Sequence, residues 1–126
     1  MLAHARPEAA SSDSTLVSKA LVRAADRLEV TNKVLARIIG VSEATVSRLK
    51  KGGYPLESGQ TPYQLSVLFI RLYRSLDAIT GGDDNVSAAW LSNPNTALSG
   101  VPIELIQSIT GLMNVIQYLD ARRSVI

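Results

Sequence analysis

The sequence predicts an all-α fold in which an N-terminal helix-turn-helix bundle packs with a smaller C-terminal helical domain. Apolar residues recur at intervals of three and four along most of the chain. No segment alternates apolar and polar residues convincingly over the length of a strand. Clusters of Gly, Pro and Asn separate the periodic segments, which are expected to form about seven helices.

Composition and length narrow the class of protein. With 126 residues, of which 46% are hydrophobic and 19% charged, the chain is expected to form one globular domain or two very small ones. It has no cysteine, which excludes disulfides, thiolate zinc sites and thiol catalysis. No apolar run approaches the roughly 20 residues of a membrane span, and the N-terminus lacks the apolar core of a signal peptide. We therefore expect a cytoplasmic protein with no membrane contact and no cofactor.

Few residues suit catalysis. The single histidine, His4, stands near the N-terminus, where we expect it to be exposed to solvent. Asp83 and Asp84 are expected to cap a helix, and no glycine-rich phosphate loop follows a strand. The sequence therefore disfavours an enzyme and offers no catalytic or metal-binding residue.

The chain divides into three expected parts. Residues 1–13, rich in Ala, Ser and Pro, are expected to form a flexible tail. Residues 14–62 are expected to form the helix-turn-helix bundle, and residues 63–126 a second helical unit. The second unit is rich in Leu and Ile and has limited capacity to bury its own apolar surface. It either packs onto the first bundle or meets another chain, in a homodimer or with a different partner.

Three helices are expected in the bundle. Ser14 opens the first, Thr31 the second and Ser42 the third, each as a side-chain cap. The first helix carries apolar residues at helical spacing as far as Leu28. The segment 51–62, rich in Gly and Pro, then ends helicity and forms an ordered loop or a brief hinge.

The second unit is expected to hold four helices. Residues 62–79 have the strongest apolar periodicity in the chain, with Pro62 in the first helical turn. Asp84 is expected to cap a short helix, and Pro102 to begin another. The last helix is expected over residues 110–122.

Residues 32–51 carry the spacing of a helix-turn-helix motif. Ala36 stands where the two helices cross and where a larger side chain would force them apart. Gly40 stands at the turn, which favours a residue able to adopt a positive φ. Apolar residues occupy the positions that lock the two helices together: Leu35, Ile39, Val41, Val46 and Leu49. A plain helical hairpin needs this periodicity but neither Ala36 nor Gly40, so the pattern favours DNA binding.

The outward positions of the second helix of this motif carry small, polar or basic side chains, which suit a major groove. With one lysine from the first helix, the candidate DNA-contacting residues are Lys33, Ser42, Glu43, Ala44, Thr45, Ser47, Arg48, Lys50 and Lys51. Arg48 is the candidate for a guanine contact, and the lysines are candidates for phosphate contacts. Residues 32–51 hold five basic residues and one acidic residue, although the net charge of the chain is only +2. The positive charge is thus concentrated on the DNA-reading segment.

An ordered set of residues in the second half carries a family resemblance. The set is Ala89-Trp90-Leu91, Asn93-Pro94-Asn95, Leu98, Gly100, Pro102 and Leu105, with Gly111 and Leu119 beyond it. This order resembles the C-terminal domain of antitoxins of the MbcA/ParS/Xre type, which also carry an Xre-like helix-turn-helix. The two resembling parts together span nearly the whole chain after the tail.

The resemblance implies a partner and a function. Such antitoxins are typically encoded beside a RES-domain toxin, an enzyme that degrades NAD⁺. They bind it through the C-terminal domain and repress their own operon through the helix-turn-helix. Because one recognition helix contacts only a few base pairs, we expect a homodimer on an inverted-repeat operator. The alternative is a repressor without a toxin, whose second half only dimerises or senses a small molecule.

The candidates for toxin contact lie in the second half, and they are Trp90, Asn95, Pro102, Tyr118, Arg122 and Arg123. Trp90 is either a core anchor or an interface residue, and Asn95 is expected to form a turn through local hydrogen bonds. Arg122 and Arg123 suit the C-terminal end of a helix, where positive charge is favoured. The sharper hypothesis is that one of these arginines enters the nucleotide pocket of the toxin, since a guanidinium donates bidentately to anions.

Overall fold

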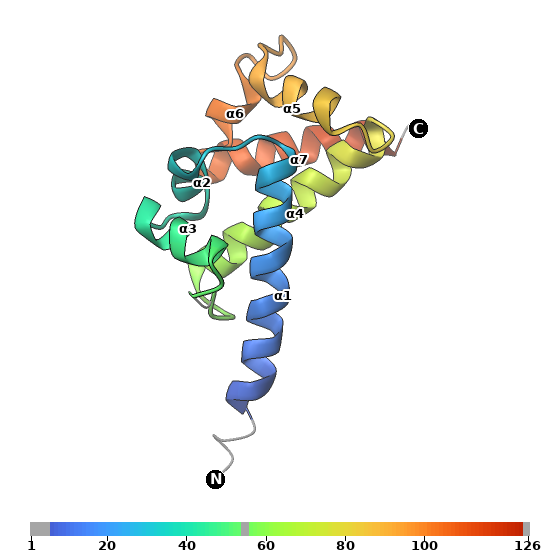
Figure 1. Ribbon diagram of the computed structural model, residues 1–126. Coiled ribbons are helices and arrows are strands. Elements are labelled where there is room, and N and C mark those ends of the chain that lie inside the picture. The colour runs from blue at the N-terminus through green and yellow to red at the C-terminus, as the bar shows by residue number, and fades with distance from the viewer. Residues whose placement is uncertain (1–5, 54–55, 125–126) are drawn as a thin grey trace.

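The computed structural model describes the backbone of residues 6–53 and 56–124, with side chains from Asp13 onward. These ranges contain seven helices and no strand, which confirms the predicted all-α class (Figure 1). The helices are α1 (Arg6–Arg27), α2 (Asn32–Ile39), α3 (Glu43–Lys50), α4 (Thr61–Ile79), α5 (Asp84–Ser92), α6 (Pro102–Leu105) and α7 (Ile109–Arg123). None of them combines the length and apolar character that a membrane crossing requires.

Helix α1 begins earlier than predicted and projects from the body of the molecule (Figure 1). It starts at Arg6, with Pro7 in its first turn followed by Glu and Ala residues that favour helix. The expected flexible tail is therefore wrong from Arg6 onward, and residues 1–5 lie outside the described residues. Ser14 is not a cap. It is buried inside the helix, where its hydroxyl donates to the backbone oxygen of Leu56 and ties the α3–α4 loop to α1.

The caps of the helix-turn-helix are as predicted. The side chain of Thr31 accepts a hydrogen bond from the backbone N–H of Val34 at the start of α2. Gly40 ends α2 in the left-handed conformation, with φ 76°, and its N–H donates to the carbonyl of Ala36. A side chain at Gly40 would meet only ordinary contact, so the backbone conformation, and not space, is what favours glycine there.

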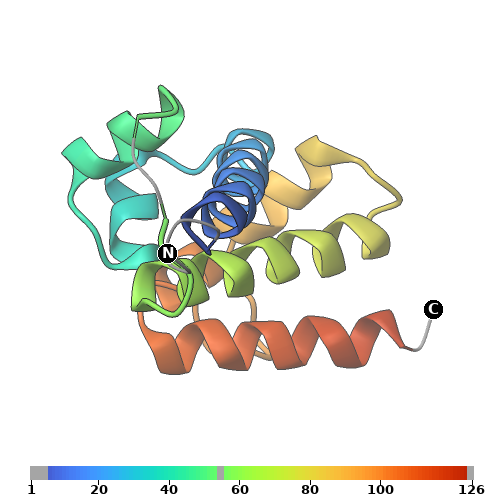
Figure 2. The same ribbon diagram turned by 90° about the horizontal axis from the view of Figure 1, so that it is seen from below.

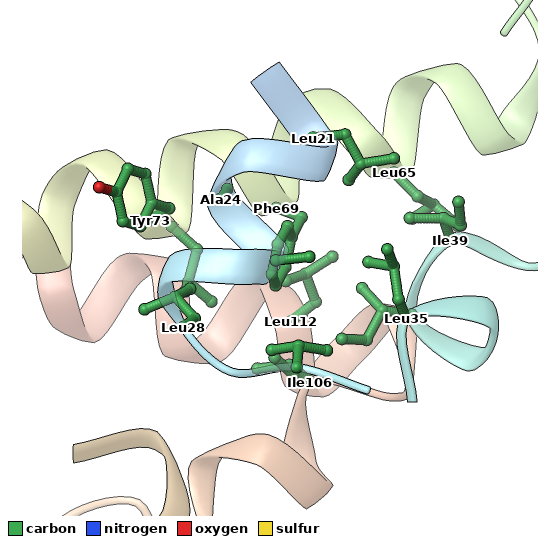
Figure 3. Close-up of a cluster of buried hydrophobic side chains, with 14 of the residues drawn as sticks. Leu21, Ala24, Leu28, Leu35, Ile39, Leu65, Phe69, Tyr73, Ile106 and Leu112 are labelled. Carbon is green, nitrogen blue, oxygen red and sulfur yellow. The ribbon is translucent and has the colours of Figure 1, made fainter. Parts of the chain in front are cut away.

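Helix α4 connects the two halves of the chain through one shared core. It packs against α1 and α2 and also against α7. Figure 3 shows Phe69 of α4 among side chains from α1, α2 and the C-terminal helices. Phe69 and Leu72 are completely buried, and so are Leu35 on α2 and Ile116 on α7. The second half thus packs onto the first bundle, which was one of the two alternatives open from the sequence.

Helices α4 and α7 lie side by side and run in the same direction, as Figure 2 shows from below. Near their C-terminal ends, Asp120 of α7 accepts hydrogen bonds from Arg71 and Ser75 of α4, the latter at 2.9 Å. Ser75 is buried, so this contact fixes the end of α7 against α4.

Of the two aspartates expected to cap helix α5, only Asp83 does so. The carboxylate of Asp83, and not of Asp84, accepts from the backbone N–H groups of Asn85 and Val86. Asp84 lies in the first turn and accepts instead from the hydroxyl of Tyr73, at 3.5 Å. Arg27 donates to the same hydroxyl at 3.1 Å, and this hydrogen bond is the main cause that raises the pKa of Arg27. The Arg27–Tyr73–Asp84 chain therefore joins α1, α4 and α5 through polar contacts.

Candidate nucleic-acid and partner interfaces

The outer face of α3 presents most of the side chains predicted to meet DNA. Glu43, Ala44, Arg48, Lys50 and Lys51 are exposed. Two residues complete the set from neighbouring positions: Lys33 on α2 and Ser42 at the cap are also exposed, while Ser47 is half-buried. Small side chains at the N-terminal end and basic ones toward the C-terminal end allow close approach to a duplex and then contact with its phosphates.

Thr45 departs from the prediction, because it is turned inward. Its side chain is only 8% exposed, so it cannot face a base edge directly. Its hydroxyl lies 3.0 Å from that of Ser42 and accepts from the guanidinium of Arg48 at 3.1 Å. The oxygen of Ser42 in turn accepts from the backbone N–H of Thr45, at 3.1 Å, as the predicted cap. Thr45 therefore holds the guanidinium of Arg48 near the N-terminal end of α3, next to the Ser42 cap.

A basic groove between α1 and α3, with a volume of about 820 Å³, was not predicted. Lys19 and Arg23 line it from α1, and Lys50 and Lys51 line it from the end of α3. Lys50 also lies 3.8 Å from Asp26 of α1, so its ammonium group is turned toward that helix. The signal was present in the sequence as basic residues four apart on α1, but only the packing of α1 beside α3 brings them next to the recognition helix.

The second candidate interface is an aromatic and basic cluster at the far end of the molecule. Trp90 of α5 stacks on Tyr118 of α7, with ring centroids 6.2 Å apart and an angle of 19° between the planes. The guanidinium carbon of Arg122 lies 5.5 Å from the centre of the Tyr118 ring. Trp90 and Tyr118 are half-buried against the core, and Arg122 is exposed. Trp90 is therefore both attached to the core and part of this surface cluster.

Arg123 stands beside the cluster on the α4 side. It is exposed and donates to the hydroxyl of Ser75 at 3.4 Å, next to the Asp120 contact. Both arginines occupy the last turn of α7, where the helix dipole favours positive charge. The dipole alternative and the partner alternative are thus both compatible with their positions.

Two of the candidates for toxin contact serve the fold. Pro102 is buried in the first turn of α6, so its ring is not available to a partner, contrary to expectation. Asn95 is half-buried, and its side-chain oxygen accepts from the backbone N–H of Leu98 at 3.1 Å. Its backbone also pairs with Gly100, which closes the loop before α6. Asn95 thus forms the expected turn.

Within the described residues, no group of three or more His, Asp or Glu side chains is placed to hold a metal ion. The surfaces that remain are the face of α3 with its basic flank, and the cluster of Trp90, Tyr118, Arg122 and Arg123, which we call the α7 cluster.

Comparison with known families assigns both surfaces to domains. Residues 8–62 match the family described as the antitoxin Xre-like helix-turn-helix domain. Residues 75–124 match the family described as the antitoxin Xre/MbcA/ParS C-terminal toxin-binding domain. A search of curated proteins finds no significant match. The face of α3 lies in the first region and the α7 cluster in the second, and together the matches cover most of the chain. The chain therefore belongs to the Xre/MbcA/ParS-type antitoxins, with an Xre-like helix-turn-helix for DNA and a C-terminal domain for a toxin.

Proposed function

We propose that this antitoxin neutralises a cognate RES-type toxin, which degrades NAD⁺, and represses its own operon as a dimer on operator DNA. The observation that carries the proposal is that the exposed face of α3 and the α7 cluster are two different surfaces on one shared core. The DNA-reading face belongs to residues 14–62, and the toxin-binding surface to residues 63–126. The RES type of the toxin rests on the family resemblance.

The face of α3 supports the DNA-binding half of the proposal. Arg48 is the candidate for a guanine contact, because Thr45 orients its exposed side chain. Ala44, one turn earlier on the same helix, is small and leaves room for the duplex to approach. Lys33, Lys50 and Lys51 supply phosphate contacts that carry no sequence preference. With about three phosphates per protomer, a dimer neutralises about six, and the slope of log affinity against log salt should be near −5.

The α7 cluster supports the toxin-binding half. Aromatic and arginine side chains are enriched among residues that dominate protein interfaces, and here they share one surface inside the toxin-binding match. Arg122 is the better candidate to enter an anion-binding pocket. The ring of Tyr118 contacts one face of the Arg122 guanidinium, whereas Arg123 donates a hydrogen bond to the hydroxyl of Ser75. A guanidinium held this way keeps N–H donors available for phosphate or carboxylate.

Point variants test this role better than a truncation. Removing residues 120–126 would also remove Asp120, which fixes the end of α7 to Arg71 and Ser75. We would express the toxin with wild-type antitoxin, with Arg122→Ala, and with Arg37→Ala as an exposed control on α2. Growth and cellular NAD⁺ should be preserved by the wild type and the control and reduced with Arg122→Ala.

The same assay separates the proposal from its alternative. A repressor without a toxin would form no stable complex with the neighbouring gene product and would leave NAD⁺ unchanged. Full protection by an Arg122→Ala, Arg123→Ala double variant would place the toxin-contacting residues elsewhere in the C-terminal domain.

A further inference from the structure

An apolar groove lies between α1 and α4, and of the residues that line it only Arg123 also belongs to the α7 cluster. It has a volume of about 500 Å³ and is lined by Leu16, Val17 and Ala20 of α1 and by Val67 and Ile70 of α4. Leu16 is 66% exposed and Val67 is 43% exposed, and both rank among the large hydrophobic side chains most open to solvent in the described part of the chain. Such a contiguous apolar surface is a mark of an interaction site.

Charges of both signs lie around this groove. Arg71, Arg74 and Arg123 line it from α4 and α7. Asp13 is exposed on α1. It lies three residues before Leu16 and seven before Ala20, which is about one and two helical turns, so the three positions share one face. The surface therefore combines a carboxylate on α1, apolar side chains on α1 and α4, and guanidinium groups on α4 and α7. A patch of this kind fits a second copy of itself turned by a two-fold rotation.

The shape of α1 supports the same occupant. Its first turns project beyond the other helices (Figure 1). An isolated helical segment is only marginally stable in water and gains most of its stability from packing. A neighbouring α1 would provide that packing along the exposed Leu16 face.

We propose that the α1–α4 groove is the interface between two copies of this chain, with α1 packed antiparallel to the partner's α1 and Leu16 at the centre. In that arrangement the partner's Asp13 lies opposite Ala20, beside Ile70 and the arginines that line the groove. Apart from Arg123, the interface lies outside residues 75–124, so it leaves Trp90, Tyr118 and Arg122 of the α7 cluster open to a toxin. The inference deepens the proposed function, because it names the surface that pairs two recognition helices on an operator.

The first test is the mass of the full chain in solution, measured by sedimentation equilibrium without DNA or toxin. The wild type should be a dimer, and Leu16→Glu and Val67→Glu should both be monomers. Ile109→Glu is the matched control, because Ile109 is 61% exposed on α7 and lies outside the groove. It should remain a dimer. Helix content by circular dichroism should be equal in all four proteins.

A charge exchange tests the orientation of the two copies. Arg74→Asp alone should weaken dimerisation about tenfold, because two-fold symmetry breaks two surface ion pairs. Adding Asp13→Arg in the same chain should restore the wild-type constant. A folded double variant that remains as weak as the single one would overturn the antiparallel arrangement.

Two further results would overturn the interface. One is a wild-type protein that is a monomer at every concentration measured. The other is a set of groove variants that stay dimeric but lose toxin binding, which would assign the groove to the toxin. Because mass is measured without DNA, a failure of operator binding would count against the proposed function and leave this inference standing.

Discussion

The two arginine-bearing surfaces of this antitoxin are built in different ways. On α3, the guanidinium of Arg48 is oriented by residues within about two turns of it, through Thr45 and the Ser42 cap. On α7, Arg122 is placed by Tyr118 of its own helix and by Trp90 of another helix. The first surface depends on local sequence spacing and the second on tertiary packing. The proposed DNA-reading face should therefore tolerate changes elsewhere in the fold better than the proposed toxin-binding surface does.

The largest effect is expected from a substitution in the core that both surfaces share. Phe69 is completely buried in α4, so Phe69→Ala should lower the free energy of unfolding by about 4 kcal/mol. The reduction should appear in a single cooperative transition, measured by denaturant titration with helix content as the signal. Val86→Ala on α5, at a site that is 52% exposed and outside the groove, should cost far less. Two separate transitions would show that the halves fold independently and that the shared core is a wrong description.

The next variant is aimed at the toxin-binding half alone. A Cβ atom added at Gly111 would lie 1.8 Å from the backbone oxygen of Leu105, so α7 must shift away from α6. Gly111→Ala should cost about 3 kcal/mol and abolish toxin binding, while operator binding at low temperature remains. Gly53→Ala is the matched control, since its added Cβ meets only ordinary contact, at 3.8 Å. Calorimetry and a pull-down with toxin measure the two effects, and equal losses for both variants would refute the selective role of Gly111.

A third variant is aimed at the DNA-reading half alone. Arg48→Ala should weaken specific operator binding by about 2 kcal/mol, roughly 30-fold, and reduce discrimination at one base pair. Toxin binding should be unchanged, because Arg48 lies on α3 within the helix-turn-helix match, whereas the α7 cluster lies within the toxin-binding match. Binding to operator and to a set of single-base variants measures both affinity and preference. An unchanged preference at every position would remove Arg48 from base recognition.

The smallest effects compare backbone strain in the two halves. Glu29 after α1 and Ser99 before α6 both adopt positive φ, at 57° and 58°, a conformation that costs a residue with a side chain about 1 kcal/mol. Glu29→Gly and Ser99→Gly should each raise the free energy of unfolding by up to about 1 kcal/mol. Thermal unfolding checks both. A loss of stability in either variant would mean that its side chain makes a contribution larger than the strain it imposes.

The accuracy of the sequence-based predictions follows the same division. Gly40, Thr31 and Ser42 were placed correctly because capping and turn formation depend on neighbours within a few residues. Ser14 was wrongly taken as a cap, since its actual partner is Leu56, far along the chain. Thr45 was wrongly predicted to face outward, because a small polar residue fits either the buried or the exposed face of a short helix.

The C-terminal half was harder to predict, apart from its family. The resemblance found the correct domain, but it did not show that Trp90 and Tyr118 stack or that Pro102 is buried. These relations depend on how α5, α6 and α7 pack, and periodicity within one helix carries no information about them. Asp83 and Asp84 were predicted as a capping pair, and the sequence did not distinguish the actual cap, Asp83, because two adjacent aspartates satisfy the same local pattern.

The most direct test of the account compares two strains, one with Arg48→Ala and the other with Arg122→Ala. Each strain carries the complete operon with a promoter reporter. The account predicts that Arg48→Ala releases the promoter while cells keep growing and retain NAD⁺. It predicts that Arg122→Ala leaves operator binding by the purified protein unchanged, while growth stops and NAD⁺ falls. If either variant impaired operator binding and toxin neutralisation to the same extent, with its fold intact, the separation of the two surfaces would be contradicted.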